Sequence, residues 1–324
     1  MSISLADIQA PVAFELKEFE KRFREIMRSK TPLLDHITHY IVKRKGKRIR
    51  PLFIFLTARL CGGISDRTYL GASLIELLHT ATLVHDDVVD DSFQRRGFFS
   101  INAIWKNKIA VLVGDYLLSK GLLLALQYDD FDFLRITSES VRMMSEGELL
   151  QIEKARKLDI EESVYFDIIR QKTASLISSA CSIGAVSAGA DKETVARMHH
   201  FGEKVGISFQ IKDDLMDYGH DKIGKPRAID IKEKKMTLPL IYTLNMVSSS
   251  EKRKLIQVVK RHNRDKKKVA WLMQTVKESG GLDYATKIMN QYRNEAIEMI
   301  TSFGNESARE SLLNLIRFTT ERKY

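Results

Sequence analysis

Apolar side chains recur every three or four positions along most of the chain, which is the spacing of one face of an α-helix. Prolines number only five, and no segment shows a convincing strand-like alternation. The pattern predicts an all-α protein built from about ten or more helices. The main helical segments are expected at residues 8–27, 33–42, 51–60, 66–89, 104–126, 131–155, 160–186, 191–217 and 238–246, with three or four more within 251–324. The segment 104–126 is expected to hold two apolar helical stretches around Gly114-Asp115.

No stretch rich in Pro, Gly or Ser divides these segments, so one domain over residues 1–324 is expected. A length of 324 residues is sufficient for a large core. Residues 219–235 are dense in charge and have little apolar periodicity. They predict a mobile loop, and long loops inside compact domains are usually functional.

Composition narrows the class of protein. A hydrophobic share of 44% excludes a disordered chain. Cys61 and Cys181 lie in apolar contexts without metal-ligand spacing, so buried thiols in a reducing compartment are expected. The first residues lack the basic start and apolar core of a signal peptide, and no uncharged apolar stretch has the length of a membrane span. We therefore expect a cytoplasmic protein.

The formal net charge of +10 fits nucleic acid, a membrane surface or a polyanionic substrate. Nucleic acid is not expected, because no binding motif is found and no aromatic residues are interleaved with the basic clusters. Basic residues gather over residues 252–268. A solvated helix surface is the simpler interpretation of this cluster, and a weak peripheral contact with anionic lipid is the alternative.

Candidate chemistry begins with four carboxylates within six residues, at the end of the apolar segment 74–84. On a helix, Asp86 and Asp90 share one face, one turn apart. Such a cluster would be repulsive and poorly solvated unless a cation binds it. Carboxylate oxygens suit hard ions such as Mg²⁺, which usually binds one or two carboxylates plus phosphate oxygens.

The Asp-Asp-x-x-Asp pattern of Asp86-Asp87-Val88-Val89-Asp90 recurs at Asp213-Asp214-Leu215-Met216-Asp217. A single copy would more often be a solvated, acidic helix end. Two copies, each at the end of an apolar helical segment and each followed by basic residues, indicate a metal-bridged diphosphate site.

Further motifs lie in a fixed order around these two copies. They are Gly46-Lys47-Arg48-Ile49-Arg50-Pro51, His79, Arg95-Arg96-Gly97, Gly114-Asp115-Tyr116-Leu117-Leu118, Gly147-Glu148-Leu149-Leu150-Gln151, Lys172-Thr173-Ala174 and Lys235-Met236-Thr237-Leu238-Pro239. With them the chain resembles the trans-isoprenyl (polyprenyl) diphosphate synthase family over residues 43–244, most closely its longer-chain, octaprenyl-type members. The resemblance implies a helical bundle around a central substrate cavity.

The resemblance also implies a Mg²⁺-dependent head-to-tail condensation of isopentenyl diphosphate with an allylic diphosphate such as geranyl or farnesyl diphosphate. About three Mg²⁺ ions are expected per active site, because charge develops on the leaving diphosphate. Asp86, Asp90 and Asp213 are the expected Mg²⁺ ligands. Asp87, Asp214 and Asp217 are expected to support them or to bind the metal through water. A homodimer is implied by the resemblance alone.

The family pattern assigns the remaining polar residues to two diphosphates. Isopentenyl diphosphate is assigned to Lys47, Arg50, His79 and Arg96. The allylic diphosphate is assigned to Arg95, Lys172, Thr173, Gln210, Lys225 and Lys235, and among these Lys172, Thr173 and Gln210 are expected to stabilise the allylic carbocation. Taken singly, His79 could be a core residue and Gln210 a structural hydrogen-bonding group.

Two residues depart from the family pattern, because Ala228 and Lys234 stand where the family commonly has glycine. If these positions require positive φ, the segment is strained, and Lys234 competes with Lys235 for the substrate. Product length is expected to depend on Ala81 and Thr82, five and four residues before Asp86. Both are small, so a medium or long product such as octaprenyl diphosphate is expected.

Other functions remain open at this point. A farnesyl- or geranylgeranyl-type synthase would use the same motifs and make a shorter product. A terpene cyclase would not need Lys47, Arg50 and Arg96 for a second diphosphate. A non-catalytic synthase subunit would tend to lose motif aspartates, and a helical binding protein would leave both motifs unexplained.

Overall fold

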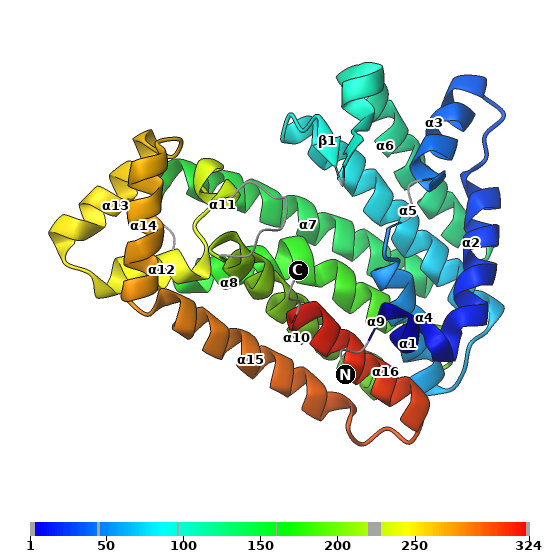
Figure 1. The fold of residues 1–324 in the computed structure, drawn as a ribbon. Coiled ribbons are helices and arrows are strands. Elements are labelled where there is room, and N and C mark those ends of the chain that lie inside the picture. The colour runs from blue at the N-terminus through cyan, green and yellow to red at the C-terminus, as the bar shows by residue number, and fades with distance from the viewer. Residues whose placement is uncertain (1–3, 44–45, 96, 160, 220–227, 322–324) are drawn as a thin grey trace. The chain divides into compact units, whose positions relative to one another are not determined.

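The computed structural model describes residues 4–43, 46–95, 97–159, 161–219 and 228–321. Their secondary structure is almost entirely helical, which confirms the all-α prediction (Figure 1). The helices are α1 Leu5–Gln9, α2 Ala13–Met27, α3 Pro32–Lys43, α4 Ile49–Cys61, α5 Asp66–Val89, α6 Ile101–Gln127, α7 Phe131–Lys157, α8 Glu162–Ile169, α9 Ser175–Ser187, α10 Lys192–Asp217, α11 Ile229–Lys232, α12 Leu238–Met246, α13 Ser249–Arg261, α14 Lys266–Glu278, α15 Gly281–Ile300 and α16 Glu306–Thr320.

The chain divides into two compact units. The first comprises Met1–Val141, Ser179–His199 and Phe303–Leu312, and the second comprises Arg142–Ser178, His200–Ser302 and Leu313–Tyr324. The expectation of one domain over the whole length stays a prediction.

In the first unit, α5 packs against α4 and α6. Helix α4 is mostly apolar, and its residues from Pro51 to Ala58 and Leu60 are buried. The ring of Phe55 packs edge-on against Phe19 of α2 and Tyr69 of α5, with centroid distances of 6.0 Å and 5.1 Å. This core fixes α5, the helix that carries the first aspartate motif at its C-terminal end.

In the second unit, one hydrophobic core joins α8, α10, α11, α12, α13, α14 and α15. Ile207 and Ile211 place one face of α10 in this core, and Leu238, Leu240 and Ile241 do the same for α12. The second aspartate motif therefore stands at the end of a helix that is held by apolar packing along its length.

Several expected boundaries were wrong, for local reasons. The helix expected at 8–27 is interrupted by a 3₁₀ turn at Ala10–Val12, where Pro11 removes a backbone donor. The expected break at Gly114 is absent: α6 continues through it, and Gly114 instead admits His85 of α5, since a methyl group there would lie 2.1 Å from His85 Nε2. The segment 66–89, by contrast, was predicted at both ends, since α5 begins at Asp66, with Ser65 as its N-cap, and ends at Val89.

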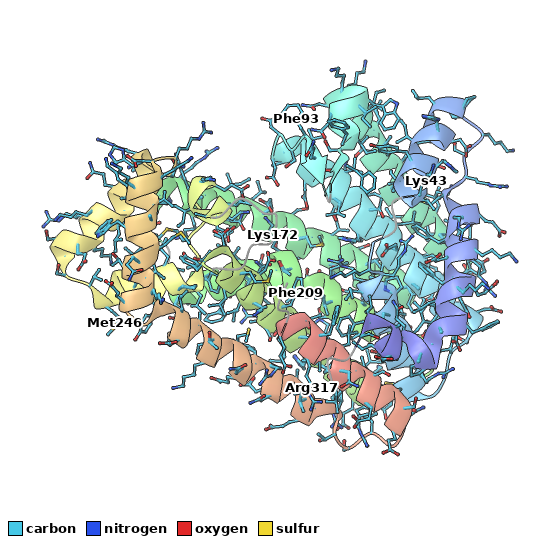
Figure 2. The ribbon with its side chains drawn as sticks, viewed as in Figure 1. Lys43, Phe93, Lys172, Phe209, Met246 and Arg317 are labelled. Atoms are coloured by element: carbon cyan, nitrogen blue, oxygen red, sulfur yellow. The ribbon has the colours of Figure 1, made fainter. Side chains whose placement is uncertain are left out.

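One strand pair was not expected from the sequence. Gln94–Arg95 (β1) and Phe98–Phe99 (β2) form a short antiparallel hairpin closed by Gly97, whose φ is +79°. Phe93, just before β1, is 69% exposed (Figure 2).

Candidate active site

The first aspartate motif forms the last turn of α5. The Asp90 amide donates to the Asp86 carbonyl at 2.8 Å, so the two residues are one helical turn apart. Asp87 is buried, whereas Asp90 is exposed and Asp86 is partly exposed. Burial thus separates the two expected metal ligands from the expected supporting residue.

Basic residues expected to bind isopentenyl diphosphate also lie in the first unit. Arg50 Nη1 lies 2.8 Å from His79 Nε2. A guanidinium can only donate, so this histidine nitrogen accepts and the ring proton is on Nδ1. The interaction leaves Nδ1 as the donor of His79, where the sequence had offered either nitrogen. Lys47 is exposed.

Two expected residues, Arg96 and Lys225, lie outside the described residues. Arg95 is described for its backbone, in β1. Their expected contacts with diphosphate stay predictions.

The second aspartate motif opens into a pocket of about 200 Å³ that lies wholly within the second unit. Six residues expected from the sequence line it: Lys172, Thr173, Gln210, Asp213, Asp214 and Lys235. The pocket brings together cations, neutral oxygens and carboxylates from segments that are far apart in sequence. Figure 2 locates Lys172 and Phe209, the residue before Gln210, in this unit.

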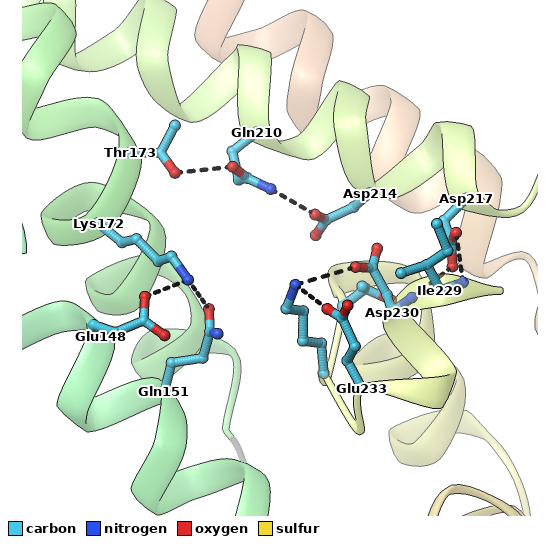
Figure 3. Close-up of polar contacts among 12 residues, drawn as sticks. Glu148, Gln151, Lys172, Thr173, Gln210, Asp214, Asp217, Ile229, Asp230 and Glu233 are labelled. Atoms are coloured by element: carbon cyan, nitrogen blue, oxygen red, sulfur yellow. Dashed lines mark hydrogen bonds and ion pairs between the residues drawn. The ribbon is translucent and has the colours of Figure 1, made fainter. Parts of the chain in front are cut away.

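A chain of hydrogen bonds runs along the pocket wall (Figure 3). Thr173 Oγ1 donates to Gln210 Oε1 at 2.9 Å, and Gln210 Nε2 donates to Asp214 Oδ1 at 3.0 Å. The Tyr165 hydroxyl donates to the other oxygen, Oδ2, at 2.7 Å. The carboxylate fixes the amide orientation, because only the amide nitrogen can donate to it.

These bonds distinguish the two neighbouring aspartates. Both oxygens of the buried Asp214 are taken by protein donors, whereas the Asp213 side chain is exposed and lines the pocket. Asp213 is therefore the one with oxygens available to a cation, and Asp214 orients Gln210.

Lys172 and Thr173 are presented by a single π-helical turn, Arg170–Ala174, between α8 and α9. Such turns are often found at functional sites. Lys172 pairs with Glu148 of α7, and its Nζ lies 3.5 Å from Gln151 Oε1 (Figure 3). Gly147 permits this approach, because a methyl group there would lie 2.9 Å from the Lys172 backbone nitrogen.

Asp217 has a structural partner. Its two carboxylate oxygens accept from the amides of Ile229 at 2.9 Å and Asp230 at 3.2 Å, which are the first residues of α11 (Figure 3). A carboxylate at a helix N-terminus is favourable. Asp217 thus connects the second aspartate motif to the segment that carries Lys235.

The residues on either side of α11 confirm the expected backbone strain. Ala228 and Lys234 have φ of +56° and +60°, the left-handed region that favours glycine. The predicted loop is partly helical, since α11 occupies Ile229–Lys232. Lys234 is exposed, whereas Lys235 lines the pocket, with Nζ 3.8 Å from Asp230 and 2.5 Å from Glu233. The geometry favours Lys235 over Lys234.

Burial raises the pKa of several carboxyl groups here. It raises the pKa of Asp214 to about 6 and that of Asp230 to about 7, although hydrogen bonds oppose the first shift and Lys235 opposes the second. Burial raises the pKa of Asp217 as well. Repulsion from Asp213 adds to all three shifts, so a cation at this place would relieve both charge crowding and desolvation.

The donor chemistry fits Mg²⁺, although no preformed cage exists in the described residues: no three Asp, Glu, His or Cys side chains converge there on a metal position. A hard ion that keeps waters and takes phosphate oxygens does not require such a cage. Asp213 offers carboxylate oxygens of the kind Mg²⁺ prefers, at the mouth of a pocket that also holds lysines.

Sequence reasoning missed several pocket residues. Tyr165 and Thr237 line the wall, Asp230 faces Lys235, and Glu148 and Gln151 hold Lys172. Glu148 and Gln151 stood in a recognised motif without an assigned role. Tyr165 carried no signal, since a tyrosine in an apolar helix usually belongs to a core.

Comparison with known proteins shows the family of the chain. A family model described as polyprenyl synthetase matches residues 31–276. The chain belongs to this family. The chain is 35% identical to an all-trans-nonaprenyl-diphosphate synthase (geranyl-diphosphate specific) of Rhodobacter capsulatus, over 98% of this chain and 97% of that protein.

Family members with other product names are nearly as similar. A geranylgeranyl diphosphate synthase of Sulfolobus acidocaldarius is 32% identical, over 94% of this chain and 99% of that protein. A crystal structure of a polyprenyl synthase from Caulobacter crescentus CB15, complexed with calcium and isoprenyl diphosphate, superposes with a TM-score of 0.91 at 30% identity, covering 100% of this chain and 99% of that one. The chain is thus a prenyltransferase of the polyprenyl diphosphate synthase type.

Proposed function

We propose that the chain is a Mg²⁺-dependent all-trans-polyprenyl diphosphate synthase that joins isopentenyl diphosphate to an allylic diphosphate by 1'-4 condensation. The observation that carries this proposal is the pocket of the second unit. There Asp213, Lys172 and Lys235 stand around the hydrogen-bonded pair Thr173–Gln210. Carboxylate, cations and neutral oxygens are the three kinds of group that ionisation of an allylic diphosphate requires.

Mg²⁺ would be held by Asp86 and Asp90 in the first unit, and by Asp213 in the second. It would neutralise the charge that develops on the leaving diphosphate. Asp87 and Asp214 are buried, follow Asp86 and Asp213 directly in sequence, and would support these ligands. Asp217 would position α11 by accepting from its first amide.

Lys172 and Lys235 bind the allylic diphosphate, together with Arg95 and Lys225. Both lysines are paired with glutamates, Lys172 with Glu148 and Lys235 with Glu233. These ion pairs hold the two ammonium groups in place at the pocket. Thr173 and Gln210 present neutral dipoles, which stabilise a carbocation without trapping it as a carboxylate would.

Isopentenyl diphosphate is bound by Lys47, Arg50, His79 and Arg96. The Arg50–His79 contact supports this assignment, because it presets two donors side by side. No described residue of the pocket is needed as a base, since the released diphosphate can accept the proton.

The proposed product is octaprenyl-like, and a farnesyl- or geranylgeranyl-type product is the alternative. Ala81 is fully buried and Thr82 partly exposed, and both are small. Either geranyl or farnesyl diphosphate is the proposed primer. Relatives named for geranylgeranyl and nonaprenyl products are about equally similar, so this part rests on the two small residues.

A homodimer in the cytoplasm is also proposed. Helix α6 is long and apolar enough to cross a membrane by length and composition alone. It nevertheless contains Lys106, Lys108, Asp115 and Lys120. Its exposed apolar residues Val111, Leu112, Leu122, Leu123 and Leu126 lie on one side by helical spacing. We assign this side to a second copy of the chain.

Variants of the aspartates test the site. Asp213→Asn and Asp86→Asn should each lower kcat about a hundredfold or more, because charge stabilisation of a leaving group is worth that much. Both should also raise the Mg²⁺ concentration needed for half-maximal rate. Glu298→Gln, which changes an exposed residue of α15, serves as the matched control and should leave both quantities unchanged. A folded Asp213→Asn variant with undiminished kcat would exclude this assignment.

A further inference from the structure

The strongest concentration of charge lies outside the pocket, in the hairpin of α13 and α14 in the second unit (Figure 1). Residues 249–280 contain ten Lys and Arg against three Asp and Glu, a net charge of +7 out of +10 for the whole chain. Six of these basic residues fall within nine positions at the turn, which we call the basic turn: Lys260, Arg261, Arg264, Lys266, Lys267 and Lys268.

All six side chains of the basic turn are exposed. None of them forms an ion pair within the part of the chain that the structure describes. The single acid among them, Asp265, is committed to capping α14, where its carboxylate accepts from the amides of Lys267 at 3.0 Å and Lys268 at 3.2 Å. The positive charge is therefore presented to solvent.

Three of the lysines occupy an electrostatically unfavourable position. Lys266, Lys267 and Lys268 form the first turn of α14, which has no acidic residue, and a helix N-terminus already carries partial positive charge. Folding alone would favour Asp or Glu at these positions. Three lysines there raise the potential of the surface, which an anionic partner would use.

An exposed tryptophan stands among these charges. Trp271 follows Lys267 by four residues and Lys268 by three, so all three share one side of α14. Trp271 lies on the side of α14 opposite to Val269, Leu272 and Val276, which pack into the core. The Trp271 side chain is 38% exposed. Indole beside lysine is the combination found at membrane interfaces, where the ring sits at headgroup level.

The basic turn is held in a fixed place. Asn263 Nδ2 donates to the Lys232 carbonyl of α11 at 2.7 Å. Helix α11 also contains Asp230, which lines the pocket. The turn is thus connected through one short helix to the wall of the pocket.

We propose that the basic turn and Trp271 form a docking surface for the anionic face of a lipid bilayer. Charge complementarity selects this partner, since clusters of four to eight basic residues beside an interfacial aromatic group bind anionic headgroups. Nucleic acid is disfavoured, because one aromatic residue provides no stacking series. The surface would bring a synthase of apolar products to the membrane, but binding itself does not depend on the proposed function.

Sedimentation of the full chain with vesicles tests the proposal in the absence of substrate. Binding is expected to phosphatidylcholine vesicles that contain phosphatidylserine, and not to phosphatidylcholine alone. The triple variant Lys260→Gln, Arg264→Gln, Lys267→Gln should bind about a hundredfold more weakly, since each basic residue near an anionic surface contributes about fivefold. The matched control is Lys21→Gln, Lys192→Gln, Lys287→Gln, which removes the same charge from exposed lysines elsewhere and should keep most of the binding.

Fluorescence tests the contact of the indole. The chain has two tryptophans, so Trp105→Phe leaves Trp271 as the reporter. Its emission should shift to the blue with phosphatidylserine vesicles and return at high salt, where charges are screened. Any of three results would overturn the proposal. They are equal binding of the triple variant and its control, an unshifted Trp271 emission, and binding of the basic turn to duplex DNA in preference to vesicles. Prenyl transfer can be assayed separately on the same variants.

Discussion

At the scale of single residues, the three aspartates of the second motif have different surroundings. Asp213 is exposed in the pocket, Asp214 is buried and bonded by Tyr165 and Gln210, and Asp217 caps α11. The motif in the sequence shows three similar acids. The fold gives one of them free oxygens for a cation and gives the other two positioning roles.

Thr82 provides the residue-scale test of product length. It lies one turn before Asp86 and is partly exposed, whereas Ala81 is fully buried, so a large side chain at Ala81 would overpack the core. Thr82→Phe should obstruct the growing chain and shorten the main product by at least one isoprene unit. Product sizing after dephosphorylation measures the change.

Leu83→Phe is the matched control for this substitution. Leu83 is also partly exposed, but it points about 100° away around α5 and should leave the product unchanged. If Thr82→Phe made the same products as the parent chain, α5 would not border the growing tail at this level.

Lys234 tests the strain of the segment beside the pocket. Its φ of +60° disfavours a side chain by about 1 kcal/mol. Lys234→Gly should therefore raise the free energy of unfolding by about 0.5–1 kcal/mol, as measured by urea denaturation. Lys232→Gly, in the helical α11, should lower it by a similar amount, and equal effects of the two substitutions would contradict the strain argument.

The sequence predicted part of the pocket for physical reasons. Lys172, Gln210 and Asp213 carry groups whose chemistry is visible in their type and motif, and the structure places them in one pocket. Tyr165 and Asp230 were not predicted, because their roles depend on which helices pack together. Tyr165 meets Asp214 across 49 positions of sequence, a contact that no local pattern encodes.

At the scale of elements, the π turn Arg170–Ala174 is the feature that presents Lys172 and Thr173. Two glycines allow helices α7 and α10 to pack closely on this π turn. Gly147 lies against Lys172, and Gly206 of α10 lies against Ala174. Helix α10, which carries the second aspartate motif, is thus seated directly on the turn that carries the lysine.

Gly206→Ala tests this seating. Alanine is the better helix former by about 1 kcal/mol, yet its methyl group would lie 2.4 Å from Ala174 Cα. The clash should dominate and destabilise the protein by about 2 kcal/mol, as measured by thermal or urea unfolding. Gly304→Ala has no heavy atom within 4 Å of its new methyl group and should change stability by less than about 0.5 kcal/mol. A stabilised Gly206→Ala variant would show that the helices are not in close contact.

Element boundaries were predicted less well than element types. Leu238–Met246 was predicted at both ends, because Pro239 lies in the first turn of a mostly apolar segment. A break was predicted at Gly114, but this glycine instead permits the close contact with His85. Glycine in a helix marks either a stop or a close approach, and the difference lies in tertiary packing.

At the scale of the whole molecule, the exposed apolar side of α6 predicts self-association. Leu112→Glu with Leu123→Glu should convert a dimer into a monomer, because each buried charge would lack a partner. Sedimentation equilibrium measures the mass. Phe14→Glu with Leu149→Glu, which changes two exposed apolar residues outside α6, is the control and should remain dimeric. A parent chain that is monomeric at micromolar concentration would contradict the assignment of this helix side.

Chain elongation is tested by incubation of the purified chain with Mg²⁺, farnesyl diphosphate and labelled isopentenyl diphosphate. We expect a ladder of labelled alcohols after dephosphorylation that ends at about forty carbons, and no label incorporation once Mg²⁺ is chelated. An end at about fifteen or twenty carbons would keep the enzyme and refute the argument from Ala81 and Thr82. Conversion of farnesyl diphosphate to a hydrocarbon, or no incorporation by the folded protein with Mg²⁺, would show that the chain is not an elongating synthase.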